Sequence, residues 1–283
     1  MKELKFSNND FLNLARLLDN HQTVQRDVSS KLYNIHLRQS WLLQSTAHPN
    51  PLSKYGNKCF SQTDEDGITF EICRRIGLAN GQFIEFGVGD GTENNTLALA
   101  AAGWSGTWFG NENLAFSTES SRINYKKGWI TLDNVFDNVI EARVDPSCVD
   151  LVSLDLDGND YYLIDKLLTH GLKPKVFLSE YNAKFMPPIR FKIELNESHR
   201  WNHDDYFGAS LSSLDDLFSG HGYRLVCCNS ASGANAFFVQ GQYADLFSDV
   251  PDCIASIYSP PNYNLLNYYG HRPSMESIEH LIR

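Results

Sequence analysis

The chain has 283 residues, of which 42% are hydrophobic and 20% charged, and its formal net charge is −10. This length is enough for one large core with an appended segment. The acidic balance argues against nucleic acid as a partner, because nucleic-acid-binding proteins usually present a basic face. No apolar run approaches the ~20 residues of a membrane span, and residues 1–20 lack an uninterrupted signal core. We therefore expect a cytoplasmic protein.

Residues 1–56 are predicted to form a helical N-terminal extension. Apolar residues recur at helical spacing from Phe11 to Leu18, and a longer, more polar helical pattern runs from Val24 to Leu43. Pro49-Asn50-Pro51 separates this region from the rest of the chain. Such an extension could cover an active site, mediate homo-oligomerisation or pack on a sheet, and the sequence leaves these three roles open.

Residues 57–250 are predicted to form one α/β domain. Strands are expected at 83–86, 107–109, 129–132, 151–154 and 176–179, with helical or irregular segments between them. This alternation is typical of parallel βαβ units. Thr63 is the expected N-cap of one helix that ends near Gly77, and a second helix is expected from Thr92 to Ala102.

The last two predicted strands, 223–228 and 236–239, are joined by a connection too short for a parallel crossover. They must therefore be antiparallel. Five parallel units closed by an antiparallel hairpin give a doubly wound mixed sheet of seven strands. Residues 251–283 are an aromatic, proline-broken tail that is expected to wrap over the sheet or over a partner subunit.

Polar residues, most of them acidic, follow each of the five parallel strands. In an open α/β sheet, ligands bind beyond the carboxyl ends of the strands. Acids scattered over a solvated surface would not fall so regularly on these ends, so the pattern predicts a site. Its candidate residues are Glu85 with Gly87, Gly89 and Gly91, then Glu112, Asp133, Asp155 with Asp157, and Glu180 with Asn182.

The stretch Phe83–Gly91 runs from a strand into a G-x-G-x-G turn. Glycine permits φ > 0 and a close approach of the backbone to a ligand. A dinucleotide fold would have its third glycine at position 92, where this chain has Thr92. Glu93 would be a poor neighbour for a pyrophosphate but suits a ligand with an ammonium group, so the turn favours S-adenosylmethionine over NAD.

Four stretches carry a resemblance to a known family: 83–91, Glu112, 153–160 and 235–239. Together they resemble class I S-adenosylmethionine-dependent methyltransferases, and among these the FkbM-like sugar and polyketide O-methyltransferases. The similarity covers roughly residues 60–240. It implies a Rossmann-like fold, S-adenosylmethionine as cofactor, and methylation of a hydroxyl on a sugar or related polyhydroxylated metabolite. Asp157-Gly158-Asn159 departs from many relatives, which have a glutamate before the glycine.

The resemblance also implies roles by position. Glu85, Gly87 and Gly89 would shape the pocket for the methionine part of the cofactor, and Glu112 would accept hydrogen bonds from the ribose hydroxyls. Asp133 or Asn134 could face the adenine, although a helix N-cap is the more natural role for Asp133.

Asp155, Asp157, Glu180 and Asn182 could converge on one cation from two neighbouring strand ends. Such oxygen ligands suit Mg²⁺, Ca²⁺ or Mn²⁺. The ion would bind substrate oxygens and lower the pKa of the acceptor hydroxyl, and metal-dependent O-methyltransferases that the chain resembles place acids at these two ends. Asp155 is thereby also a catalytic candidate. The alternative is a tight turn at 157–159 and a Glu180 paired with a base.

Residues 183–210 show no regular pattern and are rich in histidine, aromatic and charged residues. Long structureless segments in compact domains are often functional loops. His203 is the candidate general base, and a metal ligand or a solvated histidine are the alternatives. The expected substrate is a small-molecule or glycan acceptor. Two other functions stay open: an NAD-dependent oxidoreductase, and a non-catalytic nucleotide-binding protein of the same fold.

Overall fold

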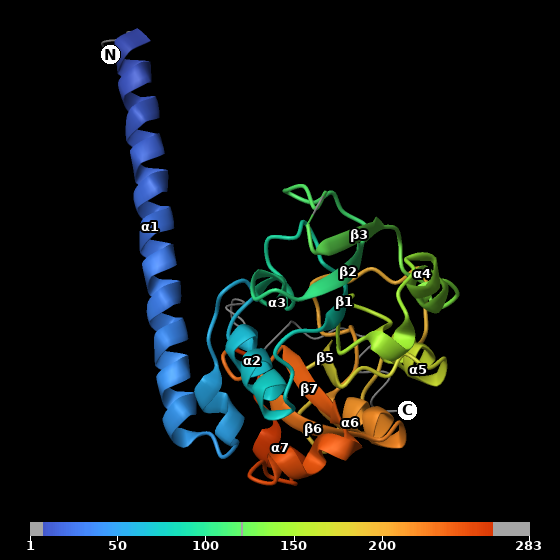
Figure 1. The fold of residues 1–283 in the computed structure, drawn as a ribbon. Coiled ribbons are helices and arrows are strands. Elements are labelled where there is room, and N and C mark those ends of the chain that lie inside the picture. The colour runs from blue at the N-terminus through green and yellow to red at the C-terminus, as the bar shows by residue number, and fades with distance from the viewer. Residues whose placement is uncertain (1–7, 120, 263–283) are drawn as a thin grey trace.

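A computed structural model describes residues 8–119 and 121–262. Figure 1 shows one α/β body with a single long helix, α1, that stands away from it. The helices are α1 (Asn8–Ala47), α2 (Glu65–Arg75), α3 (Leu97–Ala101), α4 (Val135–Glu141), α5 (Asp160–Thr169), α6 (Leu211–Gly220) and α7 (Ile254–Ile257). Short 3₁₀ helices are η1 (Pro51–Tyr55), η2 (Pro146–Cys148) and η3 (Gly241–Phe247).

The strands form one sheet in the order β3-β2-β1-β4-β5-β7-β6. They are β1 (Gln82–Phe86), β2 (Ser105–Gly110), β3 (Ile123–Lys127), β4 (Leu151–Leu154), β5 (Val176–Glu180), β6 (Tyr223–Cys228) and β7 (Asn235–Gln240). β1 to β5 pair in parallel, and β7 is antiparallel to both β5 and β6. The predicted doubly wound, mixed seven-stranded sheet of Rossmann-like architecture is therefore confirmed.

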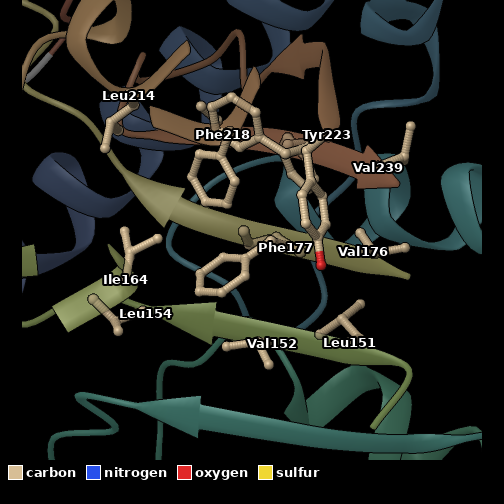
Figure 2. Close-up of a cluster of buried hydrophobic side chains, with 14 of the residues drawn as sticks. Leu151, Val152, Leu154, Ile164, Val176, Phe177, Leu214, Phe218, Tyr223 and Val239 are labelled. Atoms are coloured by element: carbon tan, nitrogen blue, oxygen red, sulfur yellow. The ribbon is translucent and has the colours of Figure 1, made fainter. Parts of the chain in front are cut away.

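The central strands are covered on both faces. All four residues of β4 are buried, as is β5 up to its last residue. This is why both segments are mostly apolar, with one buried serine each, and do not alternate between polar and apolar residues. Helices α4, α5 and α6 lie along one face (Figure 1). Figure 2 shows the core beneath them, where Phe218 of α6 meets Phe177 edge-on at a centroid distance of 5.0 Å.

The third strand is not where the sequence pattern placed it. The predicted strand 129–132 is wrong, because the strand is Ile123–Lys127 and residues 129–132 form a loop. β3 is an edge strand whose residues are mostly polar, which suits an edge but hides it from a search for apolar runs. The apolar stretch that was mistaken for a strand lines a cavity instead.

Two helix starts also differ from the prediction. Asp64, not Thr63, is the N-cap of α2, and α3 begins only at Leu97 rather than at Thr92. In both places the polar residues that resemble a helix start form hydrogen-bonded loops that precede the helix. Thr92, for example, donates its backbone N–H and its hydroxyl to the Asp90 carboxylate.

The two predicted N-terminal stripes belong to one continuous helix of 40 residues. The chain enters the body directly after it. Asn50 donates its side-chain amide to the Val226 carbonyl over 2.8 Å, and Leu52 of η1 is fully buried. The segment 48–56, which the sequence assigned to the extension, thus packs in the body.

The start of the C-terminal tail packs against the sheet. The Tyr181 hydroxyl donates to the Ser259 carbonyl over 2.6 Å, and α7 lies next to β6. The rest of the predicted aromatic tail, 263–283, lies outside the described residues. None of the described helices combines the length and the hydropathy needed to cross a bilayer.

Candidate functional site

A cavity of about 360 Å³ opens at the carboxyl ends of β1, β2 and β4. Its walls come from six parts of the chain: Gly87 and Gly89, the stretch 110–112, the stretch 128–132, the stretch 155–159, Leu163 of α5, and residues 197 and 199–201 of the long insertion. The size lies in the range typical of small-molecule sites. The cavity is where the parallel sheet predicts a ligand.

Gly87 and Gly89 both have positive φ, +90° and +52°. A Cβ on Gly87 would lie 1.6 Å from the backbone oxygen of Asp155, so no side chain fits there. A Cβ on Gly89 would meet no described atom within 4 Å. The turn therefore leaves open space above Gly89, at the wall of the cavity, into which a ligand can approach the backbone.

Glu85 lies beneath this turn rather than in the cavity wall. Its carboxylate accepts hydrogen bonds from the backbone N–H groups of Asn95 and Thr96, over 2.8 and 3.1 Å, and from the Thr96 hydroxyl. Burial raises the pKa of Glu85 to about 7 despite these donors. Glu85 thus fixes the loop that carries the glycines and occupies the N-terminus of α3.

Glu112 and the loop after β3 form the opposite wall. Glu112 follows the end of β2, is exposed and lines the cavity. The next wall is apolar and consists of Trp129, Ile130 and Leu132 around Thr131. Leu132 is the last residue of this loop that lines the cavity, and Asp133 is not among the described lining residues. Asn134 is the N-cap of α4.

Asp155, Asp157 and Glu180 are brought together although they come from two strand ends. One carboxylate oxygen from each lies within 4.8 Å of the others. Asp155 and Asp157 line the cavity, and Asp157 has the left-handed φ of +53°. Asp160 shapes this turn, because its carboxylate accepts from the backbone N–H groups of Leu156 and Gly158 over 2.8 and 2.7 Å.

The three carboxyls repel one another when they are ionised, because they lie close together. Burial, and then the mutual repulsion of the acids, raises the pKa of Asp155 and of Glu180 well above the usual range. Asp157 is exposed at the cavity mouth, and partial desolvation by the surrounding chain still raises its pKa, while the nearby His203 lowers it. Glu180 Oε2 is buried and accepts no hydrogen bond from the described residues. Either shared protons or a cation can relieve this repulsion, and the oxygen-only donor set is the one Mg²⁺ or Ca²⁺ prefers.

Asn182 is largely engaged elsewhere. Its side-chain N–H₂ donates to the carbonyls of Asp205 and Phe207 over 2.8 and 3.1 Å, which ties the insertion to the end of β5. Its Oδ1 is buried and unbonded within the described chain, so this atom alone is available to a cation.

The insertion closes the cavity with His199, Arg200 and Trp201. Residues 183–210 form neither a helix nor a strand, as predicted; they contain isolated bridge residues, among them the pair Lys192 and Ala209. The Arg200 guanidinium stacks on the Trp129 ring at 3.6 Å and joins the insertion to the β3–α4 loop. This contact completes the wall from two distant parts of the sequence.

The two histidines of the insertion are placed differently. His199 lines the cavity, its Nε2 is buried and has no hydrogen-bond partner in the described structure, and burial lowers its pKa. His203 is exposed and lies outside the cavity lining, with its ring 4.7 Å from that of Trp201 and its charge close enough to act on Asp157. Sequence reasoning chose His203, since composition alone does not tell which histidine faces inward.

Comparisons with known proteins give distant structural likenesses. No family model and no curated protein matches the chain. Among solved structures, an O-methyltransferase family 2 protein from Planctomyces limnophilus, in complex with apigenin, aligns with TM-score 0.35 and 16% identity over 56% of this chain and 51% of its own. A putative hemolysin from Lactococcus lactis aligns with TM-score 0.42 and 12% identity over 66% and 92%.

A third structure is the MycE methyltransferase of mycinamycin biosynthesis, in complex with Mg, SAH and mycinamycin VI. It aligns with TM-score 0.43 and 14% identity over 73% of this chain and 57% of its own. The chain thus spans about half the length of two of these three proteins. At such identities the likeness concerns the fold.

Proposed function

We propose that the chain is an S-adenosylmethionine-dependent O-methyltransferase that acts on a hydroxyl of a sugar or related polyhydroxylated metabolite, with help from a divalent cation. The observation that carries the proposal is the cavity itself. It combines open space above Gly89, a carboxylate from Glu112 and an apolar wall at 129–132. These features suit an amino-acid part, a ribose diol and a flat base, respectively.

The N-terminus of α3 favours this cofactor over NAD. A dinucleotide fold binds its pyrophosphate on the free N–H groups at the start of the helix that follows the glycine turn. Here the N–H groups of Asn95 and Thr96 are bonded to Glu85, and α3 begins eight residues after Gly89. A pyrophosphate would have to displace a buried carboxylate.

S-adenosylmethionine supplies, when bound, an electrophilic methyl group on a sulfonium. The protein has to hold the acceptor oxygen in line with that group and to remove its proton. Asp155, Asp157 and Glu180 would hold the cation, and Asn182 could add its Oδ1; the ion would lower the pKa of the acceptor hydroxyl. A histidine of the insertion would accept the proton. The cavity wall favours His199, with His203 as the alternative.

The proposal is tested by titrating the protein with S-adenosylhomocysteine in a calorimeter. We expect saturable binding, and we expect Gly89→Leu to weaken it at least ~10-fold, or about 1.4 kcal/mol, because the side chain fills the space above the turn. Gly77→Leu is the matched control, since Gly77 also has a positive φ and open surroundings but lies at the end of α2.

Three outcomes separate the hypotheses. The absence of S-adenosylhomocysteine binding by the intact protein would refute the methyltransferase. Binding of NADH, detected by nicotinamide fluorescence, would favour the oxidoreductase. Cofactor binding without methyl transfer to any tested polyhydroxylated acceptor would favour the non-catalytic protein.

A further inference from the structure

Helix α1 exposes an apolar stripe along most of its length. The helix has 40 residues, and at 1.5 Å per residue it is about 60 Å long. Figure 1 shows that only its C-terminal part approaches the body. Half or more of the surface of each apolar side chain in this stripe is exposed: Leu14 54%, Leu18 56%, Val28 50%, Leu32 61% and Ile35 52%. Packing against the body therefore leaves this stripe of the helix exposed to solvent.

The stripe follows a heptad repeat. Residues 11, 14, 18, 21, 25, 28, 32 and 35 are spaced alternately by three and four, as the a and d positions of a coiled coil are. Apolar residues occupy all of these positions except two, His21 and Gln25, which are neighbours at the middle of the series. A sustained repeat of this kind indicates a helical partner rather than a globular core.

We propose that α1 pairs with α1 of a second copy of this chain as an antiparallel coiled coil. One register places apolar against apolar and polar against polar throughout. In it, Leu14 of one copy lies opposite Leu32 of the other, Leu18 opposite Val28, and His21 opposite Gln25, and each pair occurs twice by the two-fold symmetry. The central polar pair fixes this register, because a shift by one heptad would place His21 and Gln25 against apolar side chains.

Charge favours the antiparallel arrangement over the parallel one. Residues 8–47 contain four basic and three acidic residues, so the acidic excess of the chain lies outside α1. Antiparallel helices hold the two acidic bodies at opposite ends of the coiled coil, several Debye lengths apart, whereas parallel helices would bring them together. A parallel pair would also place Lys31 next to His36 of the other copy at the flanking positions.

The attachment of α1 to its own body leaves the stripe accessible. The Tyr33 hydroxyl donates to the Gln62 carbonyl over 3.3 Å, and the His36 ring lies 2.9 Å from the Asn262 amide. Neither residue occupies an a or d position, and Leu32 and Ile35, beside them, remain exposed. A second copy can therefore bind without displacing these contacts.

The test is the mass of the full chain in solution, measured by light scattering and sedimentation over a range of concentrations. We expect a dimer. Leu18→Glu and Val28→Lys should each raise the dimer dissociation constant at least ~100-fold, because each buries an unpaired charge twice. The double variant Leu18→Glu/Val28→Lys should recover the dimer. In the proposed register, the glutamate at position 18 of each copy faces the lysine at position 28 of the other. Leu12→Glu is the matched control, as Leu12 is 58% exposed but lies off the seam.

Several results would overturn the proposal. One is a wild-type chain that stays monomeric at every concentration; binding of this monomer to anionic lipid vesicles through α1 would then point to a membrane surface as the partner. Another is a dimer that both single variants leave intact. A dimer broken by each single variant and not recovered by the double one would refute the antiparallel register. For each variant of the full chain, the melting temperature of the α/β body, followed by near-UV circular dichroism, should stay unchanged. This result would exclude misfolding as the cause of a lost dimer.

Discussion

Gly87 and Gly89 are two residues apart and must be glycine for different physical reasons. At Gly87 the backbone that directly follows β4 passes so close that a Cβ would collide with the Asp155 carbonyl. A Cβ at Gly89 would meet no protein atom but would project into open space at the cavity wall. A glycine at this position therefore leaves room for a ligand beside the backbone. Gly87 thus allows the chain segments after β1 and β4 to pack closely, and Gly89 leaves space in the cavity.

At the same scale, the acidic cluster makes a prediction about divalent cations. Titration of Mg²⁺ should raise the free energy of unfolding by about 2.7 kcal/mol at 100 times the dissociation constant, because the folded state alone assembles Asp155, Asp157 and Glu180. Asp155→Asn should abolish this stabilisation. The measurement is urea unfolding with and without Mg²⁺ or a chelator.

The control for the cation is Asp137→Asn, which removes an exposed acid from the first turn of α4. It should keep the full effect of Mg²⁺. Identical unfolding curves of the wild type with Mg²⁺ and with chelator would refute a cation site.

Among the elements, the insertion 183–210 is the one whose structure depends most on distant contacts. Its internal backbone hydrogen bonds are few, such as those from Ile193 to Gly208 and from Ser210 to Phe191. Asn182 at the end of β5 and the Arg200–Trp129 stack are among the contacts that tie it to the rest of the body. The loop after β3 has the same character, since its apolar residues face the cavity instead of a sheet. Both loops line the cavity, so its shape depends on how they pack.

From their positions in the insertion, we expect His199 and His203 to contribute differently to kcat. His199→Gln should lower kcat by a factor of about 10² to 10⁴ without preventing S-adenosylhomocysteine binding, as expected for a general base. Because burial lowers the pKa of His199, activity should persist to a lower pH than for an ordinary histidine. His203→Gln should change kcat only a few-fold. The reverse ranking, read from the two pH–rate profiles, would assign the base to His203.

For the whole molecule, buried acids are the dominant electrostatic feature. Burial raises the pKa of both Glu65 and Glu85 from 4.5 to about 7, and Asp155 and Glu180 shift in the same direction. These groups come from the start of α2 and from the ends of β1, β4 and β5. The folded state therefore holds protons near neutral pH that the unfolded chain releases.

The stability of the protein should consequently fall as pH rises. A carboxyl with a raised folded pKa contributes its full stability below the unfolded pKa, near 4.5, and loses it as pH passes through about 7. For Glu65 and Glu85 the loss is about 3 kcal/mol each. Urea unfolding between pH 5 and 8 measures it, and Glu65→Gln should roughly halve the change due to this pair. Rising stability over this interval would contradict the prediction.

The sequence by itself determined the architecture. The mostly apolar runs at 83–86, 151–154 and 176–179 are short and bounded by polar or turn residues, which is typical of strands in a sheet buried on both faces. The short link at 229–235 determined the antiparallel hairpin, and the positions of the strand ends determined which edge of the sheet carries polar residues. These features depend on local spacing.

Only the tertiary structure decided how those residues are used. Folding joins Asp157 to Glu180, His199 to the glycine turn and Arg200 to Trp129, and no sequence spacing encodes such distances. It also assigned Glu85 to the loop beneath the site and residues 129–132 to the cavity wall. The reason is that burial and contact depend on the packing of segments far apart in the chain, whereas periodicity reports only on neighbours.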